Sequence, residues 1–220
     1  MKGAGMHIPD GFLDAKTWIS MSVITTAIIG WSLKKTNESI GEKQVPLMGI
    51  SAAFIFAAQM LNFPIAGGTS GHFLGGCLAA LLLGPYAGLI VMSLVFIVQC
   101  FLFQDGGLTA LGANIFNAGV AGGMLSYVLL RLFGKVLKGN TGFYVSTFIV
   151  AFLSVLSAAV MASLQLAFSG TYPLDKVLVA MTSVHALIGI GEAIITIGII
   201  SLVRSVRPDL IEDNLKGILT

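Results

Sequence analysis

Residues 85–103 read PYAGLIVMSLVFIVQCFLF and contain no charged side chain. A helix that crosses a bilayer needs about 20 mostly apolar residues, and this stretch has that length and character. The rest of the chain is similar: 56% of its 220 residues are hydrophobic, 10% are charged, and the mean hydropathy is +0.94. A soluble domain carries about a quarter charged residues. The sequence therefore predicts an integral membrane protein surrounded by a lipid bilayer.

Further apolar runs on both sides of this stretch predict an all-α fold of about seven transmembrane helices. The runs cover residues 17–33, 46–61, 72–83, 85–103, 114–137, 143–168 and 176–203. The third run is short, and only Gly84-Pro85 separates it from the fourth, so we expect a short or tilted helix there. No soluble domain interrupts the series, and the chain from residue 6 to 220 is predicted to form a single transmembrane domain.

The basic residues predict the orientation of the helices. If seven helices alternate in direction, nine of the twelve Lys and Arg residues fall on one side, namely Lys34, Lys35, Lys43, Arg131, Lys135, Lys138, Arg204, Arg207 and Lys216. Basic residues are retained on the cytoplasmic side, which predicts an outside N-terminus and a cytoplasmic C-terminus. Because these residues form short clusters rather than a continuous stripe, we expect no nucleic-acid partner.

This topology places four loops on the outer side, at residues 6–14, 62–71, 104–113 and 169–175. The first three hold most of the glycine and polar residues outside the basic clusters. Irregular backbone in a membrane protein is tolerated where it is buried in protein or lines a cavity. The loops are therefore predicted to assemble into one site.

Histidines give this site its chemistry. The chain has three, and two of them are predicted on the outer side: His7 in the N-terminal segment, and His72 directly after GGTSG at 67–71, at the outer end of the third helix. Imidazole is a favoured ligand of nickel, cobalt, copper and zinc ions. Either ring could instead cap a helix or bond a carbonyl. Two rings on one face beside a glycine-rich loop make a divalent transition-metal site an equal candidate.

Three ordered motifs carry a family resemblance. MHIPDGF at 6–12, GGTSGHFLGG at 67–76 and DGGLTALGANIFN at 105–117 resemble the CbiM/NikM family, the substrate-specific (S) components of energy-coupling-factor transporters for nickel and cobalt. The resemblance extends over the chain from Met6 onward. It implies that the ion is held by the N-terminal amine, by the backbone nitrogen and ring of the second residue, and by a second histidine. Those groups correspond to Met6, His7 and His72.

The implied ligand set has its own chemical logic. An amine, the next amide nitrogen and the Nδ1 atom of His7 close a five-membered and a six-membered chelate ring. These three nitrogens lie in one plane, and His72 supplies a fourth. A planar nitrogen set favours Ni(II) or Cu(II) over tetrahedral Zn(II), which tilts the expected substrate towards nickel over cobalt.

The sequence departs from the family pattern in one respect. Residues 1–5, MKGAG, precede Met6, so the nitrogen of Met6 is an amide in the full chain. Three alternatives follow: the chain begins at Met6, the extension is removed, or the site uses a weaker set of ligands.

Other polar residues are weaker candidates. Asp105, Asn114 and Asn117 could orient the ligating loops by hydrogen bonds, or simply cap loops and helices. His185 and Glu192 share one face of the last helix, and counting residues places both too deep to reach the loop site. A structural or coupling role is expected for this pair.

The expected function is that of a nickel or cobalt uptake S component and not of an enzyme, with Ni²⁺ or Co²⁺ as the transported ion and no prosthetic group. No P-loop motif is present, so the resemblance implies ATPase subunits, a transmembrane coupling T component and a small accessory membrane subunit as partners. We expect the protein to lie in a prokaryotic cell membrane, which it crosses several times. The alternative is a stand-alone secondary transporter or channel for divalent metal cations, for which Glu192 is the main support.

Overall fold

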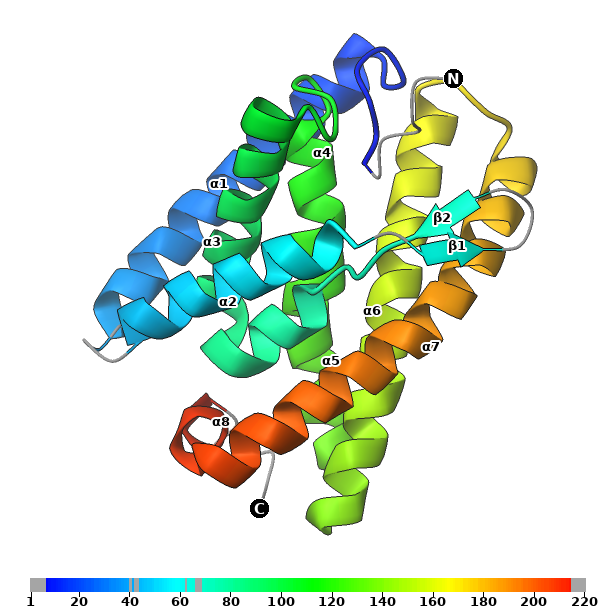
Figure 1. The fold of residues 1–220 in the computed structure, drawn as a ribbon. Coiled ribbons are helices and arrows are strands. Elements are labelled where there is room, and N and C mark those ends of the chain that lie inside the picture. Colours follow the sequence, from blue (N-terminus) through cyan, green and yellow to red (C-terminus); the bar gives the residue numbers. More distant parts are fainter. Residues whose placement is uncertain (1–6, 40, 42–43, 62, 66–68, 215–220) are drawn as a thin grey trace.

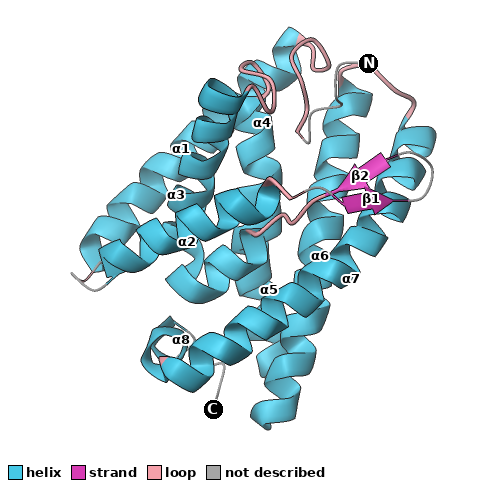
Figure 2. Ribbon diagram, in the orientation of Figure 1, coloured by secondary structure: helices cyan, strands magenta, loops and turns pink. Residues whose placement is uncertain are grey.

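The computed structural model describes residues 7–39, 41, 44–61, 63–65 and 69–214. Its helices and strands, in chain order, are α1 (Ala15–Ser39), α2 (Gln44–Gln59), β1 (Phe63–Ile65), β2 (Thr69–Gly71), α3 (Gly76–Phe103), α4 (Leu111–Ile115), η1 (Phe116–Met124), α5 (Leu125–Gly134), α6 (Gly139–Phe168), α7 (Leu174–Val206) and α8 (Pro208–Asn214). Figures 1 and 2 show a bundle of long helices with one small two-stranded sheet at its side. The predicted all-α membrane protein is confirmed.

Helix α3 consists of two helices joined by a sharp turn. Gly84 at the turn has a positive φ of 79° and a non-helical ψ of 169°, and Pro85 follows it. A Cβ on Gly88 would lie 3.0 Å from the backbone of Ala79, so the two halves fold back on each other. The first half, from residue 76 to 83, rises only about 12 Å. This confirms the predicted short helix, which begins at Gly76 rather than at His72. With the two halves counted separately and residues 111–134 taken as one helix, the described residues form the expected seven helices and, in addition, the short α8.

The predicted fifth helix is continuous from residue 111 to 134 but contains π-helical turns over Phe116–Met124 (η1). This part of the helix packs closely against the start of α3. A Cβ on Gly76 would lie 2.3 Å from the carbonyl oxygen of Ala118, so only glycine allows the approach. The contact fixes the segment that precedes α3 against the centre of the bundle.

The outer surface of the bundle suits lipid. Within the described residues, four helical stretches (76–103, 111–134, 139–168 and 174–206) are long and apolar enough to cross a membrane, and α2 is a shorter apolar helix. Large apolar side chains on their outer faces are exposed, among them Leu102, Leu132, Val179 and Leu202. Lipid accommodates such faces because apolar side chains have no hydrogen bonds with water that they would lose in the bilayer.

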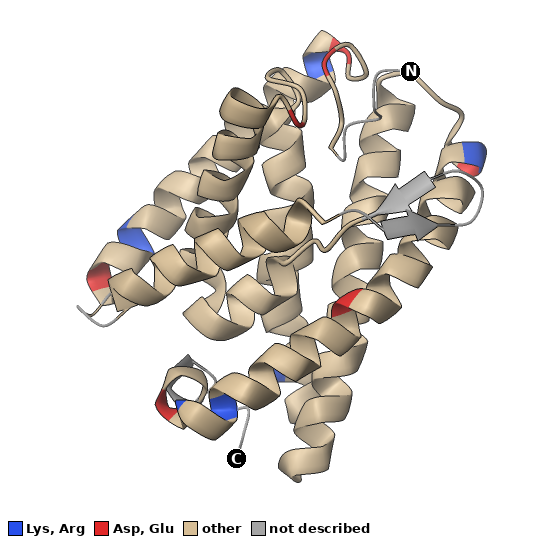
Figure 3. Ribbon diagram, in the orientation of Figure 1, with Lys and Arg blue, Asp and Glu red and all other residues tan. Residues whose placement is uncertain are grey.

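The irregular segments lie at one end and one side of this bundle. Strands β1 and β2 pair antiparallel, with Phe63 opposite Gly71 and Ile65 opposite Thr69. The N-terminal segment and the loop between α3 and α4 meet at the top of Figure 1. Figure 3 shows basic residues near both ends of α1 and near both ends of α7.

Candidate metal centre

The N-terminal segment of residues 7–14 is docked into the bundle by a set of backbone hydrogen bonds. The side-chain amide of Asn114 accepts from the Ile8 N–H and donates to the Ile8 carbonyl, both at 3.0 Å. The Gly107 N–H donates to the same carbonyl at 2.9 Å. A Cβ on Gly107 would lie 2.3 Å from the nitrogen of Asp10, so a side chain there would displace the segment.

Asp10, in the N-terminal segment, also bonds the loop between α3 and α4. Its carboxylate accepts hydrogen bonds from the backbone N–H groups of Leu108 and Thr109 and from the Thr109 hydroxyl. The hydroxyl bond has the largest effect in lowering the pKa of Asp10. Further along, the Thr171 hydroxyl donates to the carbonyl of Phe12. Three of the four predicted outer loops are thereby joined.

His7 lies at the inner end of this segment and is 9% exposed. Its ring packs on Phe96 with centroids 4.3 Å apart, and its Nε2 atom is 3.1 Å from Oε1 of Gln99. A carboxylate oxygen of Asp105 lies 3.9 Å from the same nitrogen. Burial, and then the neighbouring His72, lower the pKa of His7 to about 3, while the Gln99 bond acts in the opposite direction. The ring is therefore neutral at neutral pH, the form that binds metal ions.

His72 faces His7 across the site. It lies between β2 and α3, and the two rings meet edge to face, with centroids 5.4 Å apart and planes at 84°. Its Nδ1 atom is 3.0 Å from the carbonyl oxygen of Phe73. Because a carbonyl only accepts, Nδ1 carries the proton, and in a neutral ring Nε2 is then the nitrogen that has a lone pair for an ion.

The segment after His72 is held from two helices. The carboxylate of Glu192 in α7 accepts the N–H groups of Leu74 and Gly75 at 2.7 and 2.8 Å, and Gln59 in α2 donates to the Leu74 carbonyl at 2.6 Å. Glu192 is 2% exposed. It thus takes a structural role at the base of the His72 segment, which agrees with the structural or coupling role that the sequence predicts for it.

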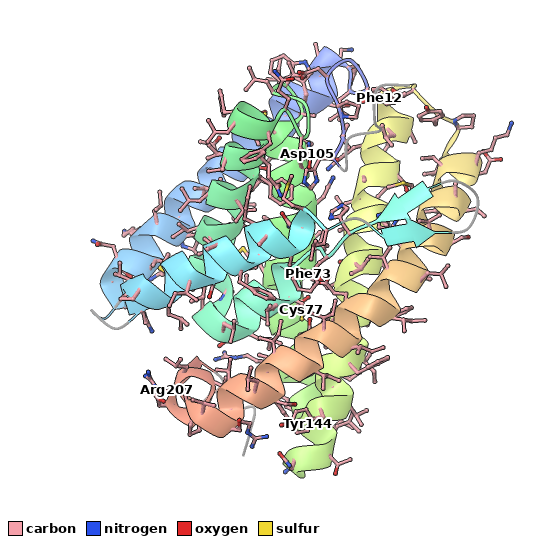
Figure 4. The ribbon with its side chains drawn as sticks, in the orientation of Figure 1. Phe12, Phe73, Cys77, Asp105, Tyr144 and Arg207 are labelled. Carbon is pink, nitrogen blue, oxygen red and sulfur yellow. The ribbon has the colours of Figure 1, made fainter. Side chains whose placement is uncertain are left out.

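A cavity of about 280 Å³ opens beside these residues and is lined by all three histidines. Its far wall is made of small side chains of η1 and α6: Ala118, Ala158, Ala159 and Ala162. At about 30 Å³ for each water, the cavity has room for a hydrated ion. Asp105 and Phe73, labelled in Figure 4, belong to the loop after α3 and to the segment after β2.

The expectation that His185 lies too deep for the site is wrong, because His185 lines the same cavity. The prediction used the number of residues between His185 and the end of its helix. His7 and His72, however, reach into the bundle from the segments that precede α1 and α3. The Nδ1 atom of His185 bonds the Met181 carbonyl of its own helix at 2.7 Å.

Asn114 and Asn117 also line this cavity, and the remaining candidates differ in what they bond. Asp105 approaches the His7 ring, and Asn114 holds the neighbouring Ile8 backbone. Asn117 instead forms a reciprocal amide pair with Gln165 of α6, at 2.7 and 2.8 Å. Met6 lies outside the described residues. Among the described residues, no group of three or more His, Cys, Asp or Glu side chains forms a metal cluster.

The structure adds two buried residues to this site, Gln59 and Gln99, whose side chains are bonded to one another at 2.8 Å. An amide within an apolar run signals an interior position, because burial without a partner is costly. The sequence carries no signal for which partner each amide takes.

Comparisons with known proteins identify the family of this chain. Residues 7–210 match the family model CbiM, described as the cobalt uptake substrate-specific transmembrane region. The chain is 41% identical over 211 residues to a putative fused nickel transport protein NikMN of Archaeoglobus fulgidus, covering 95% of this chain and 69% of that protein. It is 39% identical to a putative metal transport protein of Haloquadratum walsbyi, covering 94% and 93%. A crystal structure described as a transition metal transporter superposes with a TM-score of 0.83 at 32% identity, covering 91% of this chain and 93% of that one.

Proposed function

Since the chain belongs to the CbiM family of substrate-specific transmembrane proteins for metal uptake, we propose that it is the substrate-binding (S) component of an ATP-driven energy-coupling-factor transporter that captures Ni(II) or Co(II). The relatives are named as nickel or metal transport proteins and the family model as a cobalt uptake region. A role in nickel or cobalt transport, rather than enzymatic chemistry, is therefore the function that the family supports.

One observation supports the site above all others: the buried ring of His7 and the half-buried ring of His72 converge on one cavity within the membrane bundle. Two imidazoles alone do not complete the coordination of a transition-metal ion. The proposed set adds the amine of Met6 and the backbone nitrogen of His7, with Asp105 and Asn114 supporting the ligands. In support of this set, the docked N-terminal segment brings the His7 ring close to His72.

The proposed orientation places the N-terminal segment outside the cell and the ends of α1, α5 and α7 in the cytoplasm, in keeping with Lys35, Arg131 and Arg204 at those ends. Because the chain has no ATP-binding motif, transport in this proposal depends on ATPase subunits, a transmembrane T component and a small accessory membrane subunit. A prokaryotic cell membrane is the proposed location.

The second candidate is a stand-alone secondary transporter or channel for divalent cations. It requires ionisable residues free to act near the middle of the membrane. Both carboxylate oxygens of Glu192 already accept backbone N–H groups, so the structure favours the S-component proposal.

Metal titration of purified protein tests the site. Protein beginning at Met6, with its N-terminus verified by mass spectrometry, should bind Ni(II) tightly, and its His72→Ala variant should lose specific binding while remaining folded. Protein beginning at Met1 should bind at least about tenfold more weakly, or about 1.4 kcal/mol, because a peptide nitrogen must lose a proton to coordinate. Tight binding by the His72→Ala variant would remove His72 from the ligand set.

Uptake assays separate the two transport candidates. Cells that express the chain with the ATPase and T components should accumulate nickel or cobalt, and cells that express it alone should not. ATP-independent accumulation by the chain alone would favour the secondary transporter.

A further inference from the structure

Two buried glutamines connect His7 to the segment that follows His72. Gln59 in α2 and Gln99 in α3 are each 0% exposed. The connection runs from His7 Nε2 to Gln99 Oε1 at 3.1 Å, from Gln99 Nε2 to Gln59 Oε1 at 2.8 Å, and from Gln59 Nε2 to the Leu74 carbonyl at 2.6 Å. Neither glutamine belongs to the proposed ligand set or lines the cavity.

The direction of every bond in this chain follows from its last member. The Leu74 carbonyl can only accept, so Gln59 must turn its –NH₂ group towards Leu74 and its oxygen towards Gln99. The oxygen of Gln59 can likewise only accept, so Gln99 directs its –NH₂ group to Gln59. The oxygen of Gln99 is then left for His7, and His7 must donate from Nε2.

We propose that Gln59 and Gln99 are positioning residues that set the tautomer of His7, with the proton on Nε2 and the lone pair of Nδ1 left to bind the metal ion. A neutral imidazole has one donor nitrogen and one acceptor nitrogen, so assigning the proton to Nε2 assigns the lone pair to Nδ1. This inference rests on the proposed metal site, and it adds two residues that control which nitrogen of His7 is available there.

Two neighbouring groups reinforce the same assignment. The carboxylate of Asp105 lies 3.9 Å from Nε2 and favours a proton on that nitrogen. Glu192 fixes the Leu74 end of these hydrogen bonds, because it accepts the N–H of Leu74, whose carbonyl accepts from Gln59. The proton position on His7 is therefore linked through α3 and α2 to α7.

Breaking this series of hydrogen bonds should change the tautomer of His7 even when the substituted residue does not touch His7. In Gln59→Met the –NH₂ group of Gln99 loses its partner, so the Gln99 amide can rotate and present either end to His7. Both tautomers would then be populated. Groups that orient a ligating histidine are worth about 10–100-fold in metal affinity, and we expect a loss of that order in Gln99→Met and a smaller one in Gln59→Met.

The test measures the tautomer directly, in protein without metal. Nitrogen-15 spectra of detergent-solubilised protein with labelled histidine, assigned to His7 through a His7→Gln variant, should show a protonated Nε2 and an unprotonated Nδ1. Gln59→Met should give a mixture of the two tautomers. A wild-type ring protonated on Nδ1, or a Gln59→Met spectrum identical to the wild type, would overturn the proposal.

Gln165→Met is the matched control. It removes another buried amide that pairs with a side-chain amide on a neighbouring helix, but the Gln165–Asn117 pair bonds neither His7 nor the two glutamines. This control should keep the wild-type tautomer, and a mixture there would overturn the proposal by showing that any lost amide pair disturbs His7. Nickel titrations of the same proteins test the metal site separately: a wild type that binds no metal would refute the proposed function, while the tautomer spectra would still decide the role of the glutamines.

Discussion

Replacing Asn114 with alanine should release the N-terminal segment from the bundle. Asn114 is 5% exposed and makes two bonds of 3.0 Å to the backbone of Ile8, the residue next to His7. Each hydrogen bond contributes about 0.5–1.5 kcal/mol net, so the variant should lose about 1–3 kcal/mol of docking free energy. Since about 1.4 kcal/mol corresponds to a factor of ten, nickel affinity should fall about tenfold if docking limits binding.

Hydrogen exchange of the peptide that contains residues 7–13 measures this docking without metal, and a nickel titration measures its consequence. Asn117→Ala is the comparison, because it also removes two amide bonds from the same long helix but takes them from Gln165. Exchange at residues 7–13 should rise in Asn114→Ala and change little in Asn117→Ala. Equal exchange in wild type and Asn114→Ala, or equal increases in the two variants, would refute the argument that Asn114 docks the segment.

Three further predictions concern the same end of the molecule. Gly107→Val should displace the segment, since even a Cβ would lie 2.3 Å from the Asp10 nitrogen, and nickel binding should fall further than in Asn114→Ala; wild-type affinity would contradict the close approach. The pKa of His7 is about 3 in the folded protein against 6.5 for a free ring, so neither state gains a proton above pH 6.5, while below it only the undocked ring does. Docking measured by exchange should therefore weaken as the pH falls below about 6.5 in wild type, and a His7→Gln variant that shows the same acid dependence would assign the effect to another group. A membrane-impermeant maleimide should label Leu108→Cys in intact cells and leave Lys138→Cys unlabelled, and labelling at residue 138 would overturn the proposed orientation.

The sequence predicted the fold well because a bilayer restricts the possible structures. Apolar runs of spanning length must be helical in lipid, where each backbone group needs a partner within the protein. Gly84-Pro85 correctly indicated a short helix, because neither residue continues a helix readily. The short strands β1 and β2 and the π-helical turns of η1 were not anticipated, since both depend on close packing rather than on hydropathy.

The candidate site was predicted less completely. The sequence identified His7 and His72 as candidates, and the structure places their rings in contact. The sequence alone could not identify the partners of Gln59 and Gln99, which lie 40 residues apart, because the pairing depends on how two helices cross. The misplaced depth of His185 has the same origin: a residue count along one helix does not reveal that loops enter the bundle.

The π-helical turns of η1 have an angular consequence for the two asparagines beside them. Residues three apart lie close together around an α-helix, but a π-helix has more residues in each turn and spreads them over a wider angle. Asn114, just before η1, can therefore face the N-terminal segment while Asn117, inside it, faces α6. Deleting one residue from this stretch would restore the α-helical spacing and rotate one of the two amides away from its partner. The wide turns thus help this helix to contact two neighbours in different directions.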